Sequence, residues 1–186
     1  MTSTDLTKEQ AKQMDLFNDD QRIPVVDGGI AYVLRNGRPE LEHRLAEVFR
    51  IAWGMLPPEA TRQIERHWQD RQRFAERILI KELGFSYIGD PVLAVTLLEG
   101  HRIEFDGRGV QYLPERLLVG VTVHELAHVY AYAMGDEPHK AEFASEEERN
   151  QAEPVVERLL AAWDLCEHDK ETARWIWENR EGWGID

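Results

Sequence analysis

Cysteine and long apolar runs are the two clearest shortages in this sequence. Cys166 is the only cysteine among 186 residues, which excludes an internal disulfide framework and a zinc element built from four cysteines. The longest uncharged apolar stretches, residues 91–98 and 117–123, are far shorter than the roughly 20 residues that a membrane-spanning helix needs. The first 20 residues lack the basic stretch and apolar core of a secretory signal. Together these shortages predict a cytoplasmic protein with no membrane segment.

Basic charge is also scarce. The 22 Lys and Arg residues are outnumbered by 35 Asp and Glu residues, so the formal net charge at pH 7 is −13. Proteins that bind phosphate backbones need clustered Lys and Arg side chains. The arginines between residues 62 and 77 come closest to such a cluster, but Glu65, Asp70 and Glu76 are interleaved with them, which is typical of a solvated helix with local ion pairs. We therefore expect no nucleic-acid partner.

The length and composition are those of one compact domain. A chain of 186 residues, 42% of them hydrophobic and 31% charged, can bury a substantial core and is not typical of a disordered protein. Residues 1–20 are polar, and we expect them to form a short helix from Lys8 to Phe17 that frays or docks weakly. Neither a linker nor a repeat divides the remainder, so residues 21–186 are expected to fold as a single domain.

Turn residues and apolar spacing predict both strands and helices along this domain. Two β-prone runs between Ile23 and Leu34 flank Asp27-Gly28-Gly29 and predict a hairpin. A second antiparallel hairpin is expected between Gly84 and Gly109, with its turn at Glu99-Gly100. The expected helices run from Pro39 to Leu56, from Pro58 to about Leu83 with Ile78 on its apolar side, from Pro114 to Met134, and from Ser145 onward with Pro154 inside the pattern. These elements indicate an α+β fold with a small antiparallel sheet.

One pentapeptide carries most of the chemical information in the chain. His124 and His128 are four residues apart in a stretch predicted to be helical, so both imidazoles stand on one helix face and can reach one ion. Glu125 lies beside them, where its carboxylate can take a proton from a water that the ion activates. The same carboxylate can then hand the proton to a leaving amine. The pattern therefore predicts metal-dependent cleavage of an amide bond.

This motif is specific for a chain of this composition. With 7 His residues and the Glu content present here, the pattern would occur roughly 0.03 times by chance. The opposite face of the predicted helix is typical core material, formed by Val123, Ala127, Tyr130 and Met134. A predicted hairpin precedes the helix, and we expect its strand at residues 103–106 to be a sheet edge that pairs with an extended substrate.

The motif, together with the later stretch Ser145-Glu146-Glu147-Glu148-Arg149-Asn150, resembles the zincin metallopeptidases. The resemblance is to the small gluzincin-like type that includes the ImmA/IrrE-type proteins, and it covers about residues 91–165. It implies a zincin-like α+β fold with the sheet packed on the motif helix, and zinc-dependent hydrolysis of peptide bonds.

The resemblance also implies roles for individual residues. His124, His128 and Glu146 would bind Zn²⁺, and Glu125 would act on water. Asn150 would orient a histidine ligand through its second ring nitrogen. Arg149 departs from the family pattern, which usually has a small residue at that place, and this departure leaves the register of the third ligand open.

Two other residues compete with Glu146 as the third ligand. Helical spacing back from the apolar stripe that begins at Ala152 points to Glu148. The segment Pro138 to Phe143 is also similar to the third-ligand element of the SprT/Spartan metalloproteases, which would make His139 the ligand. The four-cysteine zinc element of that family is absent, and the acidic charge does not suit a DNA-associated protease.

Aromatic residues complete the set of candidates. Tyr132 follows His128 by one helical turn near the histidine face, so we expect its hydroxyl to stabilise the developing oxyanion. Trp175, Trp177 and Trp183 are expected to form a packing cluster, or alternatively to bind a protein partner. The sequence thus leaves two hypotheses: a zinc metallopeptidase that acts on a peptide or protein substrate, and a catalytically inactive or regulatory zincin-fold module that binds a protein.

Overall fold

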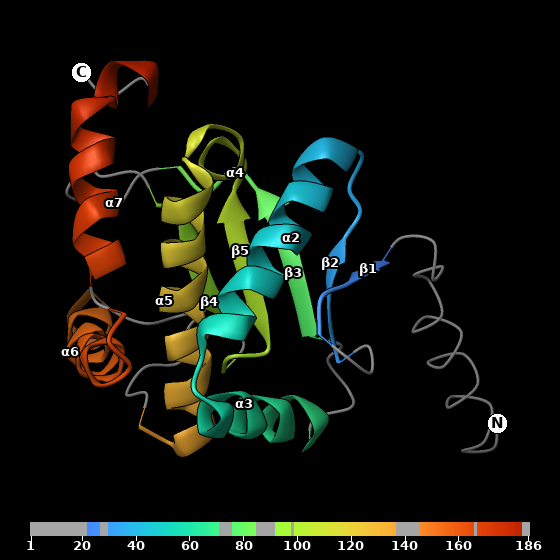
Figure 1. The fold of residues 1–186 in the computed structure, drawn as a ribbon, viewed down its shortest axis with the longest axis vertical. Coiled ribbons are helices and arrows are strands. Elements are labelled where there is room, and N and C mark those ends of the chain that lie inside the picture. Colours follow the sequence, from blue (N-terminus) through green and yellow to red (C-terminus); the bar gives the residue numbers. More distant parts are fainter. Residues whose placement is uncertain are drawn as a thin grey trace, which may run out of the picture.

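The structure is a computed structural model, and Figure 1 shows its fold. The described residues are 22–26, 30–70, 76–84, 92–97, 99–136, 146–165 and 167–183. The expectations for residues 1–20, for the turn at Asp27-Gly28-Gly29, for His139 and for the start of a helix at Ser145 lie outside these residues.

The predicted α+β class is confirmed, and its sheet has five strands. They are β1 (Arg22–Pro24), β2 (Ala31–Leu34), β3 (Glu76–Lys81), β4 (Ala94–Leu97) and β5 (Arg102–Asp106), in the order β1-β2-β3-β5-β4. The two outer pairs, β1 with β2 and β4 with β5, are antiparallel, whereas β3 is parallel to both β2 and β5. The expectation of an antiparallel sheet is therefore wrong for the inner pairs. Helices connect β2 to β3, and such a crossover returns the chain to the same end of the sheet. The strand β5 is parallel to β3 because β4, which precedes it in the chain, runs in the opposite direction.

Both predicted hairpins are present. In the first hairpin Ile23 of β1 lies opposite Val33 of β2. In the second, Thr96 of β4 lies opposite Ile103 of β5, and its turn contains two residues with positive φ, Glu99 at 54° and Gly100 at 84°. The amide of Gly100 donates to the carbonyl of Leu97 at 3.2 Å, so the chain reverses direction where Glu99 and Gly100 adopt the left-handed conformation.

The position of β5 corrects the predicted substrate edge. Residues 103–106 belong to β5, which lies between β3 and β4 and is therefore hydrogen-bonded on both sides. Within the described part of the sheet, the terminal strand on this side is β4. The sequence identified the correct hairpin but assigned the edge to the wrong strand, because strand order depends on pairing with the distant β3.

Six helices are described around the sheet. They are α2 (Pro39–Met55), α3 (Pro58–Asp70), α4 (Gly107–Tyr112), α5 (Glu115–Met134), α6 (Glu146–Ala162) and α7 (Glu167–Glu178), and a 3-10 turn, η3 (Arg180–Trp183), follows α7. The short α4 was not expected from the sequence. Pro154 lies inside α6, so the helix is not split in two there.

The predicted helix from Pro58 to about Leu83 is wrong in its second half. Helix α3 ends at Asp70, and residues 76–81 form β3 instead. In this strand Ile78 and Ile80 are almost fully buried while Leu79 between them is half-buried. This alternation is the two-residue period of a strand, which a short apolar run does not distinguish from a helix face.

Helix α5 is the central helix of the fold. It packs against α2, α3, α6, α7 and the strand β4, and Figure 1 shows it running beside α2 across one face of the sheet. It is the one described helix that is long and apolar enough to cross a bilayer, and 72% of its apolar window is buried inside the fold. Burial of this kind is typical of a core helix.

The ends of α5 differ in burial from its middle. Val123 and Ala127 belong to the core, as predicted, and Tyr130 is half-buried with its ring edge-on to Trp163. Met134 was predicted to be core as well, but its side chain is 47% exposed. It occupies the last turn, just before Gly135 ends the helix in the left-handed conformation at φ 75°.

We expect Gly100→Ala to destabilise the protein more than Gly37→Ala. Both glycines have positive φ, 84° and 91°, so an added Cβ costs about 1 kcal/mol at either position. At Gly37 nothing lies within 4 Å of that Cβ, whereas at Gly100 it would lie 3.2 Å from both His67 Nε2 and Tyr132 Cβ. Crowding should add about 1 kcal/mol at Gly100. Urea unfolding measures the difference, and equal losses for the two variants would contradict the packing of this turn.

Candidate metal and catalytic site

The predicted histidine pair lies on the middle turns of α5. His128 is 7% exposed and His124 is half-buried. Their Nε2 atoms are 3.2 Å apart, and the two rings are inclined at 65° with their centroids 4.9 Å apart. The i, i+4 spacing thus places the two Nε2 atoms next to each other on the same side of the helix.

This separation fits two ligands of one metal ion. Zinc binds imidazole nitrogen at about 2.0–2.1 Å with tetrahedral angles, which places two ligating nitrogens about 3.3–3.4 Å apart. The observed 3.2 Å between the Nε2 atoms is close to that value. Neutral imidazole nitrogen is also a ligand that zinc prefers, so the pair fits the metal that the sequence predicts.

Glu125 is the only charged residue between Leu117 and Met134, and it is buried with 6% exposure. A carboxylate in such a place needs hydrogen-bond partners to offset the loss of water. Thr96 of β4 supplies one, because its hydroxyl donates to Glu125 Oε2 at 2.7 Å. The contact exists because α5 packs directly on β4. The predicted general base is therefore held from the neighbouring terminal strand.

Thr96 was not predicted from the sequence. Its signal is weak but present: Thr96 is the only polar residue between Pro91 and Leu98. Strand periodicity places its side chain on the same sheet face as that of Ala94, two residues earlier. A hydroxyl on a buried face needs a partner, but the sequence does not indicate that this partner is Glu125.

Tyr132 lies against the β4–β5 turn. Its Cβ is 3.2 Å and its Cδ2 is 3.4 Å from the position that a Cβ on Gly100 would occupy. The side chain is half-buried. Its predicted role as an oxyanion donor stays a prediction.

Two further histidines that the sequence analysis did not single out lie at the same turn. The rings of His67 and His101 are stacked with centroids 4.4 Å apart, and His101 is 1% exposed. His67 Nε2 lies 2.7 Å from the carbonyl oxygen of Glu99, and Trp68 Nε1 donates to the carbonyl of Gly100 at 2.8 Å. Helix α3 thereby holds the turn that follows β4.

No third metal ligand is found among the described side chains. In the described part of the chain no group of three or more His, Cys, Asp or Glu residues could hold a metal ion. Glu146 and Glu148 lie in the first turn of α6, which packs against α5, but their side chains and that of Asn150 lie outside the description, as does His139. The choice among Glu146, Glu148 and His139 therefore stays a prediction.

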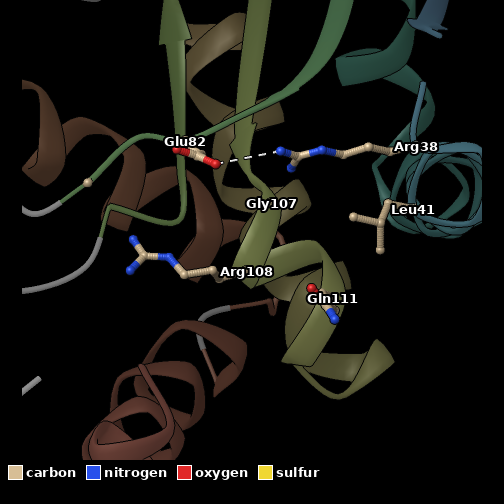
Figure 2. Close-up of a pocket in the computed structure, with 7 residues that line it drawn as sticks. Arg38, Leu41, Glu82, Gly107, Arg108 and Gln111 are labelled. Atoms are coloured by element: carbon tan, nitrogen blue, oxygen red, sulfur yellow. Dashed lines mark ion pairs between the residues drawn. The ribbon is translucent and has the colours of Figure 1, made fainter. Parts of the chain in front are cut away.

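A separate hollow of about 630 Å³ lies where β3 and β5 end and α2 begins (Figure 2). Its described lining is Arg38, Leu41, Glu82, Gly84, Gly107, Arg108 and Gln111, none of which belongs to α5 or β4. Figure 2 shows the Arg38 guanidinium directed at Glu82, 3.6 Å away, and Arg108 Nε lies 3.1 Å from the buried Asp106. Each arginine of the described lining faces a carboxylate, so these residues present no unpaired cation that would select an ionic ligand.

The tryptophans near the C-terminus do not share one environment. Trp175 is half-buried and packs against the core. Trp177 is 67% exposed, with the Arg180 guanidinium 4.7 Å from the centre of its ring. The side chain of Trp183 lies outside the description. The predicted packing cluster is therefore wrong for Trp177, because the face of α7 that carries it points to solvent.

Comparison of the chain with protein-family models, with curated proteins and with solved structures finds no match. A proposal of function therefore rests on the converging histidines and on the buried, hydrogen-bonded glutamate.

We expect the purified protein to bind about one zinc ion per chain. His128→Ala should abolish this binding because it removes one of the two converging nitrogens, and metal analysis after dialysis measures the loss. Of Glu146→Gln and Glu148→Gln, the one that also loses zinc identifies the third ligand, and retention by both would point to His139. The exposed His43 of α2 offers a matched control, since His43→Ala should leave zinc content unchanged. Full zinc binding by His128→Ala would contradict the site.

Proposed function

We propose that the protein is a zinc-dependent metallopeptidase. The observation that carries this proposal is the convergence of His124 and His128 Nε2 atoms to 3.2 Å beside the buried Glu125, whose carboxylate is held by Thr96. A metal-ligand pair next to an oriented general base is the arrangement that metal-assisted hydrolysis requires. The chain supplies both on the same helix.

Each of the site residues has its own role in the proposed reaction. Zinc, when bound, would polarise the scissile carbonyl and make water a stronger nucleophile. His124 and His128 would hold it, with Glu146 as the predicted third ligand. Because Glu125 Oε2 accepts the Thr96 hydrogen bond, Oε1 is the oxygen left to take the proton of the attacking water. The protonated carboxyl would then give that proton to the leaving amine.

The terminal strand β4 supports a peptide as the substrate. An extended peptide can add to a strand whose outer peptide groups have no neighbouring strand, and it then gains main-chain hydrogen bonds. Within the described sheet β4 is such a strand, and it lies against the helix that carries the histidines. We infer that a substrate strand pairs with β4, which brings its backbone next to Glu125.

Glu125→Gln should abolish cleavage while leaving the metal in place. The amide keeps the size and the hydrogen-bond acceptor of the carboxylate but cannot take a proton, so the cleavage rate should fall by about 10²–10⁴-fold. Zinc content and the rate of cleavage of a pool of quenched-fluorescent peptides measure the two effects. Glu115→Gln makes the same change on an exposed carboxylate in the first turn of α5 and should retain the wild-type rate. Undiminished cleavage by Glu125→Gln would contradict this mechanism.

A second candidate function is favoured by the exposed Trp177. A bulky aromatic side chain that is 67% exposed on α7 is the kind of residue that anchors protein interfaces. In this alternative the fold is a regulatory module without catalytic activity, and a protein partner binds the tryptophan-bearing end of the chain.

Peptide cleavage by the wild-type protein and by Trp177→Ala separates the two candidate functions. If the protein is a peptidase, this variant should cleave short peptides at a rate within about twofold of wild type and lose no more than about 0.5 kcal/mol of unfolding free energy, because the side chain is mostly in water. Peptide cleavage and urea unfolding measure these quantities. A wild-type protein that cleaves no peptide would instead favour the binding module.

A further inference from the structure

Thr96 connects the terminal strand to the catalytic helix. The residue is buried, with 5% of its surface exposed, and its hydroxyl oxygen lies 2.7 Å from Glu125 Oε2 and 3.2 Å from the main-chain oxygen of Glu125. A hydroxyl donates one proton at a time. The shorter distance and the negative charge favour the carboxylate as its acceptor. The main-chain oxygen remains a nearby second acceptor.

The main-chain N–H and C=O of Thr96 point in a different direction from its side chain. The amide of Asp106 in β5 donates to the carbonyl of Leu93 at 2.8 Å, and these two residues lie opposite each other just beyond the pair Ala94 and Phe105. Hydrogen-bonded and non-bonded pairs alternate along an antiparallel ladder. The main-chain N–H and C=O of Val95, and those of Leu97, therefore face β5. The main-chain N–H and C=O of Ala94 and of Thr96 face the outer edge of the sheet.

We propose that Thr96 is a positioning residue that ties substrate alignment to the general base. Its hydroxyl fixes the Glu125 carboxylate with Oε1 toward water, while its main-chain N–H and C=O pair with the backbone of a substrate strand. This inference rests on the proposed metallopeptidase function. One residue thereby sets the distance between the substrate backbone and the oxygen that receives the proton, and such alignment contributes directly to rate.

A purely structural role makes a different prediction. If the hydroxyl served only to satisfy a buried carboxylate, its removal would lower stability and leave the turnover of the folded enzyme unchanged. Threonine suits the positioning role better than serine does. Its branched Cβ restricts χ1 and so holds the hydroxyl in one direction.

Thr96→Val and Thr96→Ser separate these roles. Valine keeps the shape, the backbone and the edge pairing but removes the donor, so kcat should fall about 10–100-fold, as for other residues that orient a catalytic group, with KM within about twofold and zinc content unchanged. Serine restores the donor and should recover most of kcat. Thr122→Val is the matched control, since Thr122 is a fully buried threonine of α5 whose hydroxyl donates to Leu118 O at 2.8 Å. It should lower stability and leave kcat within about twofold.

A second measurement does not depend on activity. In metal-free protein, the melting temperatures of Thr96→Val, Glu125→Ala and the double variant form a double-mutant cycle. Because the two side chains share one hydrogen bond, the double variant should lose less than the sum of the two single losses. Additive losses would overturn the contact on which the proposal depends.

The outcomes also separate this inference from the proposed function. A wild-type protein that binds zinc and cleaves peptides, together with undiminished kcat in Thr96→Val, overturns the role of Thr96 and leaves the metallopeptidase intact. An equal fall of kcat in Thr122→Val overturns it as well. A wild-type protein that cleaves no peptide overturns the metallopeptidase and the positioning role together.

Discussion

The helix that carries the histidine pair is in contact with four other helices and with a strand, and its burial constrains the structure around it. Leu117, Leu126 and Val129 are fully buried on α5, as expected for a helix that is apolar on nearly all sides. Glu125 is the one acidic residue buried in this helix, and its carboxylate is covered almost as completely as these apolar side chains. A charge in such a position is stable only if the neighbouring element offers it a donor. The packing of α5 on β4, with the Thr96 hydroxyl at the contact, meets this requirement.

The strand β4 is in turn held by the turn that follows it. Gly100 has a positive φ and lies between His67 of α3 and Tyr132 of α5. The Trp68 indole donates to the carbonyl of Gly100, and His67 lies against the carbonyl of Glu99. These contacts place β4 at a defined position along α5. Glu125, the strand beside it and the end of α3 therefore form one connected unit, which is how this fold can orient the proposed general base.

The errors of sequence interpretation have a common physical origin. The run from Glu76 to Lys81 has apolar residues that fit a helix face or a strand equally well over so short a length. It becomes a strand because β2 and β5 pair with it on both sides, and both partners are distant in sequence. The same pairing moves β5 into the interior of the sheet and leaves β4 as its terminal strand on that side.

Local sequence by itself determined the span of α5, its end at Gly135, both hairpins and the placing of His124, Glu125 and His128 on adjacent faces of one helix, because caps, turns and helical spacing act within a few residues. Only the tertiary structure decided that the sheet is mixed, that β4 rather than β5 is the terminal strand, and that Met134 is exposed. It also decided that Thr96 meets Glu125, which lies 29 residues later in the chain. Contacts of this kind depend on how separate elements pack together. The sequence around a buried polar side chain does not specify which distant residue will become its hydrogen-bond partner.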